Sequence, residues 1–153
     1  MGTFKVKKEK EKLDVETHSG FPLYAATKEV FRACQPELTK FGLTYTQYLA
    51  MSVIWELKTV NLKAIGERLF LDSGTLTPLL RKLESKGLIL RERLKDDERS
   101  MVITLTARGQ SLQKKVHHIP ELIESKIGLG PEEMQVLQGL LLKVLHNVKG
   151  CTI

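Results

Sequence analysis

Small hydroxyl side chains and cations alternate with leucines in the stretch LDSGTLTPLLRKLESKGL, residues 71–88. From Leu76 to Leu83 the leucines follow the i, i+3, i+4, i+7 spacing that places side chains on one stripe of an α-helix. The opposite face presents hydroxyls and then cations, which suit phosphates and base edges. An ordinary solvated face with capping hydroxyls would have the same composition. The outer residues are Ser73, Thr75, Thr77, Pro78, Arg81, Lys82 and Ser85.

The ends of this helix are predicted from its flanking residues. Asp72 or Ser73 can cap its start by accepting a hydrogen bond from a free N–H group of the first turn. Gly87 stands where a left-handed C-terminal cap would end the helix. Pro78 is compatible with a helix because it lies within about a turn of the start, where few backbone hydrogen bonds are lost.

The neighbouring segments predict a winged helix-turn-helix. The stretch NLKAIGERLF, residues 61–70, has a shorter apolar helical pattern and lies only a few residues before the leucine-rich helix. Two short helices joined in this way form a helix-turn-helix, whose second helix enters the major groove of DNA. Apolar segments at 88–94 and 100–106 flank the polar loop KDDERS and predict a two-stranded hairpin. The whole unit is expected to span about residues 46–106.

Further helices are expected at both ends of the chain. Residues 21–40 and 46–57 read as helices, the second apolar almost all round and therefore buried. Thr106 caps another helix, which Pro120 must kink or break, and Pro131 opens the last one. The last helix has more apolar surface than a monomer requires, which predicts a partner subunit. Its apolar residues are Met134, Leu137, Leu140, Leu141, Val144, Leu145 and Val148.

Composition bounds the class of protein. The 153 residues carry a net charge of +6 and are 42% hydrophobic, which suits a single domain with its own core and favours a polyanionic partner. We expect residues 1–15 to be a basic disordered tail and residues 16–153 one domain, with dimerisation helices at about 17–40 and 107–149. No signal peptide, membrane span or myristoylation motif is recognisable, so a cytoplasmic location is expected.

Three motifs resemble the MarR family of bacterial winged-helix regulators, in particular its organic-hydroperoxide and oxidation-sensing branch. They are LTYTQYLAMSVIWE at 43–56, LDSGTLTPLLRKLESKGLI at 71–89 and RERLKDDERSMVITLTARG at 91–109. The resemblance implies a mainly α fold with a small β hairpin and a helical dimerisation layer formed by both termini. It also implies a homodimeric repressor that binds a pseudo-palindromic DNA operator, with the second helix of the motif in the major groove and the wing in the minor groove.

The residue types suggest a role for each candidate DNA contact. Gly74 and Ser73 allow backbone N–H groups to approach a phosphate, while Thr75, Thr77 and Pro78 can meet base edges. Arg81 can pair with guanine and Lys82 with phosphate. On the wing, Arg91 and Arg93 are further candidates, Arg99 is predicted to enter the minor groove, and Asp97 to steer it through a salt bridge. A plain surface ion pair is the alternative for Asp97 and Arg99.

The sensing chemistry departs from the resembled branch. Tyr24 and Tyr45 stand at the family's tyrosine positions, but Gly20 stands where the reactive cysteine belongs, and Cys34 replaces a third tyrosine. One alternative is a cleft that binds a small apolar or aromatic effector, lined by Tyr24, Tyr45, Tyr48 and Trp55. Another is a disulfide between Cys34 and Cys151 across the dimer, formed in response to organic hydroperoxide. A regulator that acts constitutively is the third.

Other classes of protein are less consistent with the sequence. Of the four histidines only His117 and His118 are close, and adjacent helical residues point about 100° apart, so they cannot easily share a metal. Two cysteines are too few for a disulfide framework or zinc site. No enzyme activity, metal or cofactor is expected. The remaining alternative is a protein-interaction module that uses the winged helix without binding specific DNA.

Overall fold

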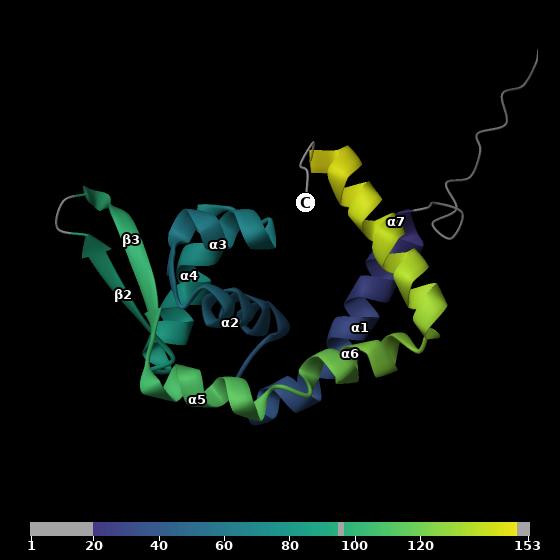
Figure 1. Cartoon of the computed structure of the whole chain (residues 1–153), viewed down its shortest axis with the longest axis horizontal. Coiled ribbons are helices and arrows are strands. Elements are labelled where there is room, and N and C mark those ends of the chain that lie inside the picture. Colours follow the sequence, from purple (N-terminus) through teal and green to yellow (C-terminus); the bar gives the residue numbers. More distant parts are fainter. Residues whose placement is uncertain (1–19, 95–96, 150–153) are drawn as a thin grey trace, which may run out of the picture.

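The computed structural model describes residues 20–94 and 97–149, so the predicted basic tail and Cys151 lie outside the described residues. Seven helices and three strands form this part of the chain (Figure 1). Their order is α1 (Gly20–Lys40), α2 (Tyr45–Leu57), β1 (Thr59–Asn61), α3 (Leu62–Leu69), α4 (Ser73–Ser85), β2 (Ile89–Leu94), β3 (Asp97–Leu105), α5 (Ala107–Lys115), α6 (Ile119–Ile127) and α7 (Pro131–Lys149).

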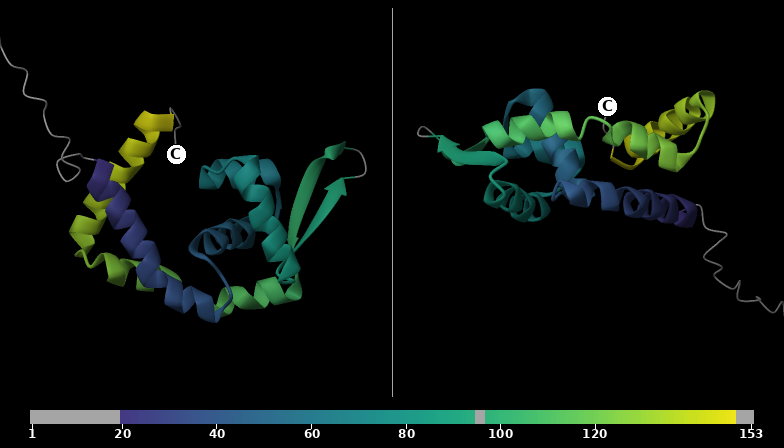
Figure 2. Two further views of the ribbon diagram at one scale, coloured as in Figure 1. Left: turned by 180° about the vertical axis from the view of Figure 1, so that it is seen from behind. Right: turned by 90° about the horizontal axis from the view of Figure 1, so that it is seen from below.

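The elements form two groups joined by α5 and by the turn between α1 and α2. Helices α2, α3 and α4 pack with the strands, while α1 packs against α6 and lies at the other end of the molecule together with α7 (Figure 1). The views in Figure 2 show the same separation, with the β2–β3 hairpin at one extremity and α7 near the other. Mainly α content with a small β hairpin, as predicted, is confirmed.

The sheet has three strands, not the two of the predicted hairpin. β1 pairs antiparallel with β3, which also pairs with β2, giving the order β1-β3-β2. The predicted polar loop at 95–100 is also too long, because β3 begins at Asp97. Arg93 pairs with Met101 but Leu94 pairs with Asp97, so residues 98–100 are extra on β3 and form an irregularity near the tip.

One apolar core joins α2, α4 and the sheet. The leucine stripe of α4 supplies Leu76, Leu80 and Leu83, each almost fully buried, while Leu79 is only partly covered. Met51 and Ile54 of α2 pack into the same cluster, which confirms the predicted burial of this helix. Since burying one such side chain stabilises the fold by about 1.5–3 kcal/mol, the stripe fixes which face of α4 points outward.

Side-chain caps set the helix boundaries where the sequence predicted them. Asp72, rather than Ser73, caps α4, and Gly87 after its end has φ +65°, a left-handed conformation that glycine adopts without strain. Thr106 caps α5, which ends at Lys115, and Pro120 lies in the first turn of α6. Pro131 opens α7. The prolines therefore end one helix and start two others, as expected.

Candidate nucleic-acid interface and pockets

The first turn of α4 is organised by Asp72. Its carboxylate accepts one hydrogen bond from the Thr75 backbone N–H and another from the Thr75 hydroxyl, both at 2.9 Å. These bonds favour the ionised form and hold the pKa of Asp72 below its ordinary value. A Cβ at position 74 would lie 3.0 Å from the Asp72 oxygen, so Gly74 leaves room for the cap itself. The Thr75 hydroxyl therefore donates its proton within the protein, while the residue remains exposed and its oxygen can still accept a hydrogen bond.

The remaining candidate contacts on α4 face outward. Ser73, Pro78, Arg81 and Lys82 are exposed, and Thr77 is half-buried. Neither cation has an ion-pair partner within the ranges that the structure describes. α4 thus presents two uncompensated positive charges on the face opposite its leucine stripe, beyond a first turn whose amide dipoles also favour an anion.

Arg91 differs from these outward-facing residues, because its side chain pairs within the protein, and its role as a DNA contact remains a prediction. Its guanidinium is bonded to the Glu84 carboxylate of α4 at 2.6 Å, and only 15% of its side chain is exposed. Arg91 pairs in register with the buried Ile103, so its side chain shares the sheet face that covers α4. Two residues further along β2, Arg93 is exposed and keeps its predicted role as a candidate contact.

The predicted wing contacts lie near the irregular end of the sheet. The backbone of Asp97 and Arg99 belongs to β3, but their side chains lie outside the described residues. The proposed salt bridge between them and the minor-groove role of Arg99 remain predictions. The hairpin itself extends well beyond the helices, as Figure 1 shows.

An aromatic row connects α1 to α2. The rings of Phe31 and Tyr45 stack with centroids 4.0 Å apart, Tyr45 lies 6.2 Å from Tyr48, and Tyr48 lies 6.4 Å from Trp55. The Trp55 indole N–H donates to the backbone carbonyl of Gly109 at 2.9 Å. This row joins three of the four residues predicted for the effector cleft.

A pocket of about 280 Å³ lies beside the end of this row, between α2 and the junction of α5 with α6. Tyr48 and Trp55 line it, but Tyr45 and Tyr24 are not among its lining residues. Tyr24 is 61% exposed on α1, where its hydroxyl is 3.4 Å from the Lys28 ammonium. The other lining residues are Ser52, Glu56, Gln113, Val116, His117 and Pro120.

Cys34 is fully buried on α1. Burial raises the pKa of its thiol, and the positive charge of Lys126 on α6 opposes this effect only in part. Burial also raises the pKa of Tyr45, and the charge of Cys34 adds to this effect. Since the thiolate is the reactive form, this environment makes Cys34 a poor nucleophile.

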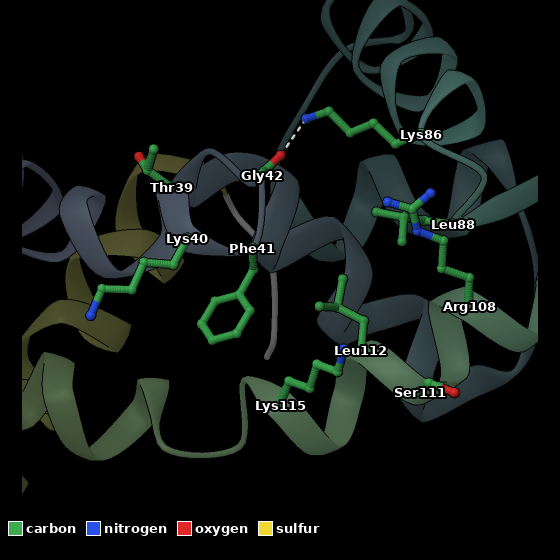
Figure 3. Close-up of a pocket in the computed structure, with 10 residues that line it drawn as sticks. All are labelled: Thr39, Lys40, Phe41, Gly42, Lys86, Leu88, Arg108, Ser111, Leu112 and Lys115. Atoms are coloured by element: carbon green, nitrogen blue, oxygen red, sulfur yellow. Dashed lines mark hydrogen bonds between the residues drawn. The ribbon is translucent and has the colours of Figure 1, made fainter.

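A second, larger pocket of about 540 Å³ was not predicted. It lies between the end of α1, the turn after α4 and one face of α5 (Figure 3). Its lining residues come from three separate segments, each ordinary in sequence, so no local motif could have indicated it. They are Thr39, Lys40, Phe41, Gly42, Lys86, Leu88, Arg108, Ser111, Leu112 and Lys115.

No metal centre is evident among the described residues, where no group of three His, Cys, Asp or Glu side chains could hold an ion. The His117 ring is 2.7 Å from the Lys114 carbonyl, and the His118 ring is 3.2 Å from the Glu37 carboxylate. Within the described ranges no helix combines the length and apolarity needed to cross a bilayer.

A helix-turn-helix followed by an antiparallel hairpin, with the basic face of its second helix turned outward, defines a winged-helix regulator of the MarR type. A family model described as transcriptional regulator SarA/Rot matches residues 32–116. The chain belongs to this family of transcriptional regulators.

Individual relatives agree with the family. The organic hydroperoxide resistance transcriptional regulator of Bacillus subtilis is 40% identical over 136 residues, which are 89% of this chain and 92% of the relative. Reduced AbfR bound to DNA is 35% identical with a TM-score of 0.71, over 84% of this chain and 90% of that one. A MarR mutant of E. coli complexed with operator DNA shares the fold, at 24% identity and a TM-score of 0.75, over 82% and 92% of the two chains.

Proposed function

We propose that the chain is a sequence-specific repressor that binds a pseudo-palindromic DNA operator as a homodimer. The observation that carries this proposal is the outward face of α4, where exposed Arg81 and Lys82 follow a capped, dipole-positive helix start. α4 lies in the major groove and the wing, with Arg93 and Arg99, reaches the flanking minor groove. Relatives solved with DNA support the same mode.

The dimer forms through α7 and the start of α1. Residues 131–148 of α7 include no buried side chain in the single chain, and apolar residues among them are widely exposed, Leu140 at 57% and Val148 at 75%. Phe21, Leu23 and Phe31 on α1 are exposed as well. An apolar surface of this extent is characteristic of an association interface. A second copy that covers it places two α4 helices at a fixed separation, which a two-fold symmetric operator requires.

An effector other than peroxide releases the repressor. Related regulators are named for organic hydroperoxide resistance or were solved in an overoxidised form. In this chain Gly20 stands where the family's reactive cysteine is expected, and Cys34 is buried with a raised pKa. The aromatic pocket at Tyr48 and Trp55 offers a small apolar or aromatic molecule a binding place instead. The protein acts in the cytoplasm and is not an enzyme.

Selection of bound genomic fragments followed by footprinting tests this function. We expect one palindromic sequence whose half-sites are about one helical turn apart, and an affinity that falls linearly in log salt. Equal affinity for all fragments would contradict a sequence-specific repressor. Protection of a single unpaired half-site would contradict the dimer.

A further inference from the structure

Lys86 connects the end of α4 to the turn that joins α1 to α2. It is the C-cap residue of α4, and its half-buried side chain extends toward Gly42 in Figure 3. Its ammonium donates hydrogen bonds to the backbone carbonyl of Gly42 and, at 2.8 Å, to the side-chain oxygen of Gln47. Since Gly42 lies just after α1 and Gln47 lies in the first turn of α2, one side chain joins three helices.

Both acceptors are fixed by bonds of their own. Gln47 is only 4% exposed, and its side-chain oxygen also accepts from the Thr44 backbone N–H, which completes the capping box of α2. Gly42 has φ +69°, and its N–H donates to the Thr39 carbonyl in the turn that ends α1. Because neither acceptor can follow a moving ammonium, the two bonds of Lys86 restrict where the end of α4 lies.

The charge of Lys86 is used inside the protein. Its ammonium has no carboxylate partner within the described part of the chain, and two of its three N–H groups donate to neutral oxygens. Burial and the nearby charge of Lys82 lower the pKa of Lys86. Hydrogen bonds from a charged donor are stronger than bonds between neutral groups, so the cation holds this position better than a neutral side chain would.

Lys86 lies at the opposite end of α4 from the candidate base contacts. The helix has 13 residues and is therefore about 20 Å long. A tilt of about 10° at the Lys86 end would move the first turn of α4 by about 3.5 Å, which is close to the rise of one base pair. A small freedom at Lys86 would therefore displace the base contacts by a whole base pair.

The other side of the connection leads to the proposed dimer interface. Gly42 lies two residues after the end of α1, whose exposed Phe21, Leu23 and Phe31 belong to that interface. In a dimer the separation of the two α4 helices depends on how each is held to its own α1. We propose that Lys86 is a positioning residue that determines which spacing of half-sites the dimer accepts. This inference rests on the homodimeric repressor proposed above.

The test uses the full chain with Lys86→Met, which keeps most of the side-chain length but removes the donors. Lys115→Met is the matched control, because Lys115 lines the same pocket and has no hydrogen bond or ion pair among the described residues. Mobility shift measures affinity for the palindrome, for palindromes with one base pair added or removed between the half-sites, and for a single half-site.

Altered spacing should weaken binding by the wild type and by Lys115→Met at least about tenfold, because a rigid dimer cannot follow it. For Lys86→Met this penalty should be at least about threefold smaller. Its affinity for a single half-site and its salt slope should match those of Lys115→Met, since neither lysine contacts a phosphate. An unchanged spacing penalty, or a specific loss of half-site affinity, would overturn the positioning role.

Amide hydrogen exchange tests the connection without DNA. Lys86→Met should speed exchange at Tyr48 and Leu88, which lie on its two sides, at least about threefold relative to Leu122 on α6. Unchanged relative exchange would overturn the connection. A wild type that binds a single half-site as tightly as the palindrome would contradict the homodimeric repressor, while the exchange result still decides whether Lys86 holds α4.

Discussion

The guanidinium of Arg91 donates two hydrogen bonds to a single carboxylate oxygen of Glu84, at 2.6 and 2.8 Å. This pair links the start of β2 to the C-terminal end of α4, so it restricts how the hairpin and α4 are oriented relative to each other. We expect Arg91 to affect DNA binding at least through the position of the wing relative to α4.

Replacement of Arg91 by alanine should lower the free energy of unfolding by about 1–2 kcal/mol, because Glu84 then lacks its charged partner. Arg93→Ala, on the same strand but exposed, should change stability by less than about 0.5 kcal/mol. Urea unfolding measures both. A double-mutant cycle with Glu84→Gln should give a coupling energy clearly above zero, and additive effects would show that the pair contributes nothing.

Arg81 and Lys82 should differ in what they contribute to DNA binding. Arg81→Ala should cost about 1–3 kcal/mol and relax sequence preference, since a guanine pair is lost. Lys82→Ala should weaken all sequences alike and reduce the salt slope by about one unit. Arg32→Ala, an exposed arginine on α1, provides the control and should leave operator affinity unchanged in mobility-shift titrations. Identical operator affinity of the Arg81 and Arg32 variants would show that Arg81 does not contact the operator.

The exposed apolar face of α7 predicts a dimer that a single charge can weaken. Leu140→Asp should shift sedimentation at micromolar concentration toward monomer, because the carboxylate would have to be buried against the partner. Gln135→Asp introduces the same charge on the polar side of α7, and its sedimentation should match the wild type. If both variants stay dimeric, the interface lies elsewhere.

Cys34 should resist modification in the folded protein. In a Cys151→Ser background, a thiol reagent at pH 8 should react with Cys34 only after denaturation, since the thiol is buried and its raised pKa keeps the thiolate fraction small. Organic hydroperoxide should leave operator affinity unchanged. Rapid operator release that Cys34→Ser abolishes would make Cys34 a sensor after all.

A gain of function can be sought at position 20. A Cβ at Gly20 would meet no atom within 4 Å, so a cysteine fits there, at the start of α1, where the helix dipole lowers a thiol pKa. We expect Gly20→Cys to react with hydroperoxide faster than the wild type.

The Asp72 cap predicts a specific acid sensitivity. The pKa of Asp72 is lowered in the folded protein, so its stabilising contribution is complete above the unfolded value of about 3.9 and is lost as pH falls through the lower folded value. Thermal unfolding of the wild type and of Asp72→Ala should differ at pH 6 and converge in strong acid. A difference that is independent of pH would mean that the charge of the cap is irrelevant.

The sequence pattern correctly predicted those features of the fold that depend on residues close together in the chain. The leucine stripe of α4, its Asp72 cap and Gly87 end all follow from neighbouring residues. β1 was missed because three residues carry too little pattern to indicate a strand, and only pairing with β3 makes them one. The ion pair of Arg91 was not predicted, because nothing in the sequence shows that Glu84, on another element, lies beside it.

The pocket between α1 and α5 could not be predicted from patterns in the sequence. Lys40, Lys86 and Lys115 belong to segments far apart in the chain, and each would be read as an ordinary solvated cation. Tertiary packing alone brings them around Phe41. Two of the four residues predicted for the effector cleft line one pocket, because Tyr48 and Trp55 are seven residues apart and therefore lie on the same face of α2. Tyr24 belongs to α1, whose position relative to α2 depends on tertiary contacts.

Trp55 is the only tryptophan of the chain, and its indole is bonded to the carbonyl of Gly109 on α5. α5 is the connection between the DNA-binding elements and the helices at the other end of the molecule (Figure 1). The tryptophan emission of the protein therefore reports on the contact between α2 and α5, without any attached dye. A movement that separates α5 from α2 would expose the indole to water and shift its emission to the red. Tryptophan fluorescence can therefore detect a change in the packing of α5 against α2.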